Sequence, residues 1–219
     1  MTLEEFKQKA KTDDDWAPGW DAIDSVFDAL YPGQEPAHFA TDFTSRAMFG
    51  GNEYLDGYSI YTSDHGYKHL VTYGMTELYA NEEAFGGEYN GWGYEMTIKL
   101  AETDVERCMW ATNVLANLAR YTYQNKRYFE PYEFIANQGN SICANRPSAI
   151  TALLTVSDTE ASGVDTIYGR TDFIQLVGIT ELELTALKNN RDLAMTLVER
   201  MKQENPYLVT DLNRTKSYL

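Results

Sequence analysis

An alternating segment followed by a long amphipathic helix constrains this chain more than any other part of its sequence. Between residues 94 and 100, apolar side chains alternate with polar ones, which predicts a strand with one buried and one solvated face. From Thr103 to about Gln124, small and apolar residues recur on one helical face, and Thr103 and Glu106 have the spacing of a capping box. Because both elements must bury their apolar sides, the sequence predicts a layer of helix packed on sheet.

The other predicted elements surround this pair without an internal repeat or a linker. The almost continuously apolar run 173–177 predicts a central strand, and residues 38–56 form a turn-rich aromatic stretch. The N-terminus holds either a helix beginning at Leu3 or a loose extension over residues 1–15. Helices are expected at 18–30, 181–188 and 191–203, and strands at 58–62, 68–73, 129–136, 150–156 and 207–212. This mixture predicts one α+β domain over residues 1–219, with a mixed, mostly antiparallel sheet packed by helices.

The formal net charge of −15 limits the partners that this chain can bind. A strongly acidic protein repels nucleic acid and anionic membranes and attracts basic partners, although solubility alone also explains such a charge. No run approaches the ~18 consecutive apolar residues of a membrane span. The charged N-terminus lacks the apolar core of a signal peptide, which predicts a cytoplasmic protein. In that compartment the two cysteines, Cys108 and Cys143, are expected to be free thiols.

Residues suited to catalysis or metal binding are present but do not form a recognisable motif. His65 and His69 lie in turn-like and strand-like surroundings, without a third ligand at the spacing of a metal site. The glycines at 86–87 and 91–93 precede a strand, whereas a phosphate-binding loop follows one. Cys108 falls on the apolar helix face, which predicts a buried thiol rather than a nucleophile. We therefore predict no catalytic residue, metal or cofactor, and a small hydrolase with an acidic cleft is the weaker alternative.

Aromatic residues beside carboxylates are concentrated at 121–124 and 128–133. Tyrosine suits protein interfaces, because it combines apolar area with a hydroxyl group and loses little entropy on binding. The same residues would equally suit the edge of a hydrophobic core. If residues 129–136 form an edge strand, a partner peptide can add to it by strand pairing.

Seven short motifs in the same order are similar to those of the Suppressor of fused domain family. The resemblance extends from Ala17 to Asn213. The motifs are APGWDAID at 17–24, YPGQEPAHF at 31–39, LDGYSIY at 55–61, TYGMTELY at 72–79, GYEMT at 93–97, LARY at 118–121 and FIQLVGITEL at 173–182.

This resemblance implies an α+β domain that binds protein rather than catalysing a reaction. Animal members restrain Gli-type transcription factors and hold a short peptide as an added strand between this domain and a second, C-terminal one. Carried over by motif, the partner-binding residues are Tyr121, Phe129 and Glu133, where Glu133 replaces the family's aspartate.

The animal members' second domain has no counterpart in these 219 residues, so we expect a free-standing, bacterial-type member. Such members are thought to be immunity proteins, and the acidity would suit capture of a basic toxin. The alternative is a regulator that sequesters an intracellular protein through a short peptide added to an edge strand. In both cases the expected partner is a protein, with no nucleic acid or membrane involved.

Overall fold

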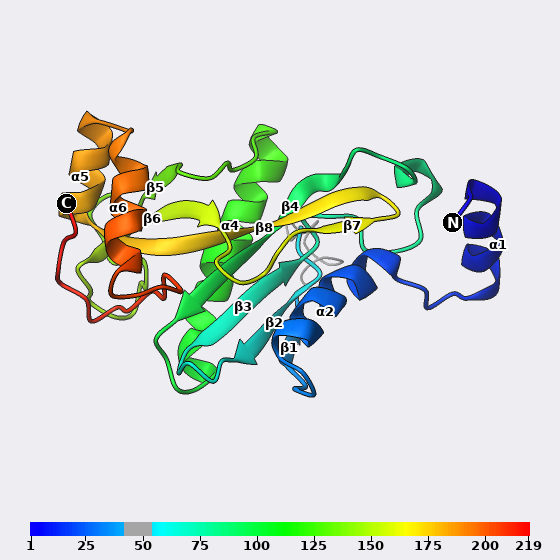
Figure 1. Cartoon of the computed structure of the whole chain (residues 1–219), viewed down its shortest axis with the longest axis horizontal. Helices are drawn as coiled ribbons and strands as arrows, with labels where there is room; N and C mark the ends of the chain where they lie inside the picture. The colour runs from blue at the N-terminus through cyan, green and yellow to red at the C-terminus, as the bar shows by residue number, and fades with distance from the viewer. Residues whose placement is uncertain (42–53) are drawn as a thin grey trace.

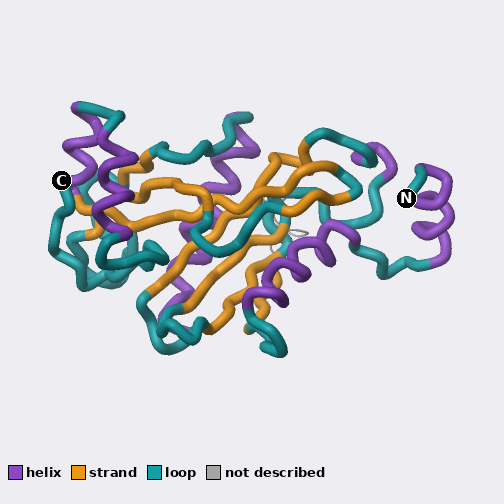
Figure 2. The backbone as a smooth tube through the Cα atoms, viewed as in Figure 1, coloured by secondary structure: helices purple, strands orange, loops and turns teal. Residues whose placement is uncertain are grey.

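The computed structural model describes residues 1–41 and 54–219, so most of the predicted turn-rich stretch at 38–56 lies outside the described residues. The described chain is an α+β fold of one mixed sheet with flanking helices, as predicted (Figures 1 and 2). The helices are α1 (Leu3–Thr12), α2 (Pro18–Leu30), α4 (Met109–Asn125), α5 (Glu181–Asn189) and α6 (Leu193–Lys202), with 3-10 turns η1 (Glu82–Ala84) and η2 (Glu106–Cys108). The strands are β1 (Ala37–Ala40), β2 (Gly57–Thr62), β3 (Lys68–Tyr73), β4 (Tyr89–Leu100), β5 (Phe134–Ala136), β6 (Ile150–Ser157), β7 (Val164–Thr166) and β8 (Gly169–Thr180).

The sheet is built around a parallel pair. Its strands follow the order β1-β2-β3-β4-β8-β6-β5, with β7 paired to β8 beside this path. β4 and β8 run parallel, with Thr97 opposite Gln175, and the other described strand pairs are antiparallel. The predicted central position of residues 173–177 is confirmed, because β8 lies between β4 and β6. The strands at the two ends of this order are β1 and β5.

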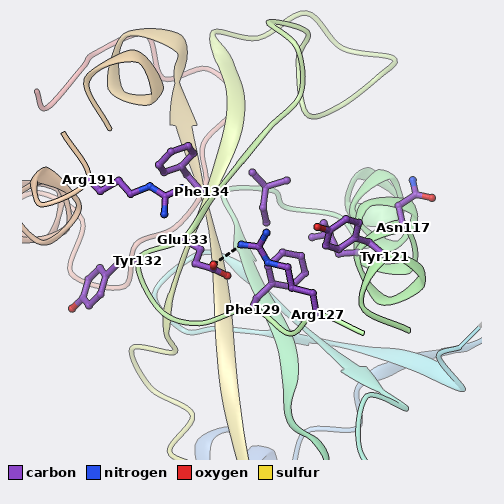
Figure 3. A pocket seen from close by; sticks show the side chains of 10 residues that line it. Asn117, Tyr121, Arg127, Phe129, Tyr132, Glu133, Phe134 and Arg191 are labelled. Atoms are coloured by element: carbon purple, nitrogen blue, oxygen red, sulfur yellow. Dashed lines mark hydrogen bonds and ion pairs between the residues drawn. The ribbon is translucent and has the colours of Figure 1, made fainter. Parts of the chain in front are cut away.

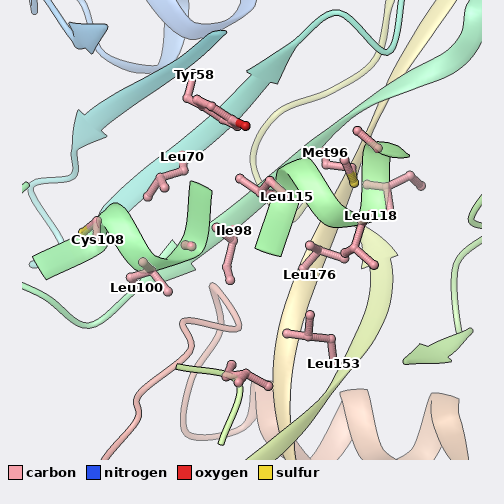
Figure 4. Close-up of a cluster of buried hydrophobic side chains, with 14 of the residues drawn as sticks. Tyr58, Leu70, Met96, Ile98, Leu100, Cys108, Leu115, Leu118, Leu153 and Leu176 are labelled. Atoms are coloured by element: carbon pink, nitrogen blue, oxygen red, sulfur yellow. The ribbon is translucent and has the colours of Figure 1, made fainter. Parts of the chain in front are cut away.

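One face of the sheet is covered by α4, and the main hydrophobic core lies between them (Figure 4). Ala111, Leu115 and Ala119 recur every four positions on α4 and are almost completely buried. They pack with residues of the central strands such as Ile98 and Leu176. The apolar stripe predicted from the sequence is therefore the core-facing side of this helix. Loss of a side chain such as that of Leu115 would cost about 2–5 kcal/mol of folding free energy.

The opposite face is covered by α2 at one end and by α5 and α6 at the other (Figure 1). Phe173, near the start of β8, packs with Ile23 and Phe27 of α2. Val177 and Ile179, further along the same face of β8, pack with α5 and α6. Between the two apolar clusters lies a band of buried polar side chains from neighbouring strands. Its strand residues include His69, Thr97, Lys99 and Gln175.

The N-terminal segment forms a helix that begins at Leu3, and Thr2 and Glu5 make its capping box. Phe6 is only 1% exposed and packs with Trp16, Phe85 and Tyr168. The first residues of the chain are thus held by an aromatic cluster of their own. None of the helices in residues 1–41 and 54–219 is long and apolar enough to cross a membrane.

The long helix begins later than predicted. Residues 103–105 bend, η2 follows, and α4 starts at Met109 without a side-chain cap. The predicted capping box at Thr103 is wrong, because the Thr103 hydroxyl donates to the carboxylate of its neighbour Asp104 at 2.9 Å. A local side-chain contact of this kind competes with capping.

Two predicted strands are shorter than expected. Of the predicted strand 129–136, Phe134–Ala136 forms the strand β5, because Tyr132 has a left-handed φ of 71° that interrupts the extended backbone. The predicted strand 207–212 makes one parallel bridge, between Thr210 and Leu100, and Leu208 has a φ of 53°. The sequence does not predict β1 or β7, whose four and three residues are too few to show alternation.

β4 begins at Tyr89, before the alternating segment 94–100 from which a strand was predicted, so that Gly91 and Gly93 lie within the strand. Gly91 has a φ of 56°, and a Cβ at this position would lie 2.8 Å from the carbonyl oxygen of Met75. A glycine is therefore required here so that β4 can pass close to the loop after β3.

Candidate partner-binding groove

A groove runs between α4 and the segment from Arg127 to Ala136, and the three residues singled out from the sequence meet in it (Figure 3). Its first cavity has a volume of about 320 Å³ and is lined by Tyr121, Phe129 and Glu133 among others. Tyr121 comes from the last turns of α4, whereas Phe129 and Glu133 come from the loop before β5. The loop turns back because Lys126 and Tyr132 both adopt left-handed backbone conformations.

Tyr121 and Phe129 form an aromatic wall of the groove. Their rings stack with centroids 5.9 Å apart and an interplanar angle of 25°. Tyr121 is 39% exposed, whereas Phe129 is only 7% exposed and donates its backbone N–H to the Tyr94 hydroxyl at 3.2 Å. Tyr121 therefore presents part of its ring at the surface of the groove, and Phe129 supports that ring from the core side.

Glu133 is engaged within the chain itself. Its Oε1 lies 2.8 Å from Nη2 of Arg127, and its Oε2 accepts the backbone N–H of Glu130 at 3.1 Å. The side chain of Glu133 is 26% exposed and that of Arg127 is 58% exposed. Glu133 therefore holds the loop from 127 to 133 in shape, and a cation from a partner would have to compete with Arg127 for it.

The groove continues into a second, more apolar cavity of about 670 Å³. The two cavities share Asn117, Leu118 and Ile135. Trp110 lines the second cavity, and its buried indole Nε1 has no hydrogen-bond partner among the described residues. This part of the groove suits apolar side chains, with Val114 and Ile142 on its walls.

β5 presents an open strand edge along the groove. It is the last strand of the sheet and pairs only with β6 within the described part of the chain. The backbone of residues 133 and 137 bonds to β6, because the Glu133 carbonyl accepts from Thr155 at 2.8 Å and the Asn137 N–H donates to Thr151 at 3.1 Å. In an antiparallel pair the bonding direction alternates along the strand. The N–H and C=O groups of Phe134 and Ala136 therefore point away from β6, toward the open edge.

Sequence reasoning missed the two arginines of the first cavity, Arg127 and Arg191. Arg191 lies between α5 and α6, and its guanidinium carbon sits 5.4 Å from the centre of the Phe134 ring. Arg127 had a weak signal, since it adjoins the aromatic segment 128–133. Arg191 had none, because only the packing of α5 beside β5 brings it to the groove.

A buried polar cluster lies between α2 and α6, on the face opposite α4. Lys99 Nζ lies 2.9 Å from Asp158 Oδ1 and 2.8 Å from Glu160 Oε2. His69 Nε2 lies 3.0 Å from Asp158 Oδ2, and its Nδ1 lies 2.8 Å from the Tyr31 hydroxyl. Burial opposes ionisation of Asp158, but its contacts with His69, Lys99 and a threonine hydroxyl hold its pKa well below the usual range. The side chains of Lys99, Asp158 and His69 are completely buried, so this cluster is part of the core.

The other candidate reactive residues are also accounted for by packing. The His65 ring stacks on Tyr207 with centroids 4.4 Å apart, away from the contacts of His69. Across residues 1–41 and 54–219, no group of three or more His, Cys, Asp and Glu side chains is arranged to hold a metal ion. Cys108 and Cys143 are free and buried, and burial raises the pKa of the Cys108 thiol to about 12. Such a thiol stays protonated at neutral pH and is a poor nucleophile.

Comparison with known families and curated proteins gives a consistent result. A family model described as Suppressor of fused protein matches residues 51–215. The chain is 26% identical over 202 residues to the Suppressor of fused homologs of Homo sapiens and Mus musculus. This match covers 84% of the chain but only 41% of each homolog, so the chain spans less than half the length of these relatives.

Solved structures share the fold. A chain from the crystal structure of the Sufu–Fu complex superposes with a TM-score of 0.78 at 24% identity, covering 92% of this chain and 93% of the other. Drosophila Suppressor of Fused gives a TM-score of 0.78 at 25% identity, covering 92% of this chain and 51% of the other. A putative homolog from Neisseria gonorrhoeae gives 0.60 at 15% identity, covering 92% and 97%.

Proposed function

The chain belongs to the Suppressor of fused family, and from that premise we propose that it is a non-enzymatic protein-binding domain whose groove receives an extended segment of a partner. The observation that carries this proposal is the meeting of Tyr121, Phe129 and Glu133 in one groove beside the open edge of β5. A structural relative comes from a complex, the Sufu–Fu complex, which supports a binding role for the fold.

The groove suits strand addition for a physical reason. The outward N–H and C=O groups of Phe134 and Ala136 supply main-chain hydrogen bonds that do not depend on the partner's sequence. The aromatic wall at Tyr121 and the apolar second cavity then supply the side-chain contacts. Exposed tyrosines in such positions commonly dominate the binding energy of an interface.

The finer proposal is that the partner is a toxin and that this protein is its immunity protein. The net charge of −15 supports it, because an acidic protein captures a basic toxin rapidly through electrostatic steering. The alternative is a regulator that sequesters an intracellular protein through the same groove. The small hydrolase has no observation in its favour among the described residues, since Cys108 is buried and Glu133 is paired with Arg127.

The test is a tagged pull-down from the native cells, with the bound proteins identified by mass spectrometry. The immunity proposal expects one stoichiometric partner that is toxic when expressed alone and harmless when expressed with this chain. A single non-toxic partner would support the regulator instead. Recovery of no protein, or of several unrelated ones, would refute a dedicated inhibitor.

The groove is tested with the recovered partner by calorimetry. We expect Tyr121→Ala to weaken binding by about 2 kcal/mol, the size of an interface hot spot. Tyr89→Ala is the matched control, because Tyr89 is 59% exposed at the start of β4 and does not line the groove. Equal affinities of both variants and the unmodified protein would remove the groove from the proposal.

A further inference from the structure

We propose that the groove selects partner segments that carry a carboxylate side chain, and that Arg191 binds this carboxylate. The inference rests on the proposed function, because it concerns the occupant of the same groove. It is drawn from the charged groups that line the first cavity. Their net charge is positive, whereas the net charge of the whole chain is negative.

Among the described residues that line the groove, Arg191 is the cation without a carboxylate partner. Its guanidinium group stacks over the ring of Phe134 at 5.4 Å, which fixes it at the cavity wall without using its hydrogen-bond donors (Figure 3). In the described parts of the chain, no carboxylate lies within ion-pair distance of Arg191. A planar guanidinium held in this way is suited to a bidentate contact with an incoming carboxylate.

The other charges of the first cavity already neutralise each other. Arg127 and Glu133 form an ion pair at 2.8 Å, and the second oxygen of Glu133 accepts a backbone N–H. The cavity is therefore lined by two guanidinium groups against one carboxylate. A basic side chain of a partner would have to displace Arg127 from Glu133, whereas an acidic side chain can bind the hydrogen-bond donors of Arg191 directly.

The overall charge of −15 does not cancel this local preference. At physiological ionic strength charges are screened over about 8 Å, so contacts at the groove depend mainly on the groups that line it. The second cavity adds one carboxylate, that of Glu106, and otherwise has uncharged walls.

The register of β5 specifies where the carboxylate should lie. Phe134 packs toward α5 and α6, whereas Ile135 packs toward the core under α4. A partner residue opposite Phe134 would direct its side chain to the same face, about 5 Å away and beside Arg191. Its neighbours on both sides would point toward the α4 face. The one beside Ile135 would enter the apolar second cavity, and the one beside Glu133 would face the aromatic wall at Tyr121. The expected recognition pattern is therefore apolar–acidic–apolar.

The test uses a displayed library of random octapeptides selected on the intact protein. The unmodified protein should enrich peptides with Asp or Glu between apolar residues. Arg191→Glu should lose or reverse this preference, and Lys188→Glu, an equal charge change at an exposed position of α5 outside the groove, should keep it. Unchanged preference for acidic peptides in Arg191→Glu would overturn the assignment.

An enriched peptide and its Glu→Gln analogue then allow a double-mutant cycle measured by fluorescence polarisation. The analogue should bind about tenfold more weakly to the unmodified protein and about equally to Arg191→Gln. Equal binding of both peptides to the unmodified protein would refute a contact with Arg191.

A third variant separates this inference from the proposed function. Ala136→Pro removes an outward N–H from the edge strand, where proline is tolerated. If the unmodified protein enriches neutral or basic peptides and Ala136→Pro no longer binds them, carboxylate selection is refuted and strand addition remains supported. Absence of any enrichment by the unmodified protein, or enrichment that Ala136→Pro and Tyr121→Ala leave unchanged, would refute groove binding itself.

Discussion

The buried polar cluster and the groove both contain basic and acidic side chains, but these are fully paired in the cluster and only partly paired in the groove. In the cluster, Lys99 contacts two carboxylates and Asp158 is fully surrounded by partners. In the groove, Arg127 and Glu133 form a partly exposed pair, and Arg191 stacks on an aromatic ring without a carboxylate partner among the described residues. Buried charges need ion-pair or hydrogen-bond partners within the chain, whereas exposed charges are solvated by water and stay available to another molecule. The state of its charges therefore distinguishes the buried cluster from the groove that we propose binds a partner.

The largest expected effect lies in the buried cluster. Lys99→Met should lower the free energy of unfolding by about 3–5 kcal/mol, because it leaves the buried Asp158 without its ammonium partner. Urea unfolding followed by circular dichroism measures this change. Lys188→Met, at an exposed position of α5, is the control and should change stability by less than about 0.5 kcal/mol. Similar effects of the two substitutions would break the comparison.

A second expected effect is a dependence of stability on pH. It compares two buried carboxylates, Glu95 and Asp158, whose pKa values are shifted in opposite directions. Glu95 is buried and accepts hydrogen bonds from the hydroxyls of Thr72 and Thr76 and the backbone of Gly74, Met75 and Thr76, all of them neutral donors. Burial outweighs these bonds and raises the pKa of Glu95 from 4.5 to about 7. Asp158, which has cationic partners, is shifted in the opposite direction.

Titration of these two carboxylates should change the stability of the fold in different pH ranges. The raised pKa of Glu95 means that the folded state binds its proton more tightly, so stability should fall by up to about 3 kcal/mol as pH rises from about 4.5 to 7. The lowered pKa of Asp158 means that its contribution is lost as pH falls below about 4. Urea titrations across pH measure both windows. Glu95→Gln should remove the pH dependence between 4.5 and 7, and its persistence in that variant would assign it to another group.

The smallest expected effect lies in the groove. Arg127→Met should change the free energy of unfolding far less than Lys99→Met does, because its pair with Glu133 is partly exposed and screened by solvent. The same denaturation measurement applies, and high salt should leave the difference between the variant and the unmodified protein near zero. A loss as large as that of Lys99→Met would mean that the groove pair is structural.

The sequence predicted the elements whose patterns are long and regular. The stripe on α4, the alternation in β4 and the apolar run in β8 each reflect a repeated local geometry, so they can be recognised without knowledge of the fold. Short strands such as β1 and the early bends at 103–105 offered no such repeat. The edge strand was placed in the correct region but too long, since the left-handed residue Tyr132 carries no distinctive sequence signal.

The sequence by itself determined the α+β class, the core faces of the main elements and, through family motifs, the three groove residues Tyr121, Phe129 and Glu133. Only the tertiary structure decided how the charges are paired. The contacts of Lys99 with Asp158 and of Arg191 with Phe134 join segments far apart in the chain. The physical reason is that periodicity is a local property, whereas burial and charge pairing depend on which distant segments the sheet brings together.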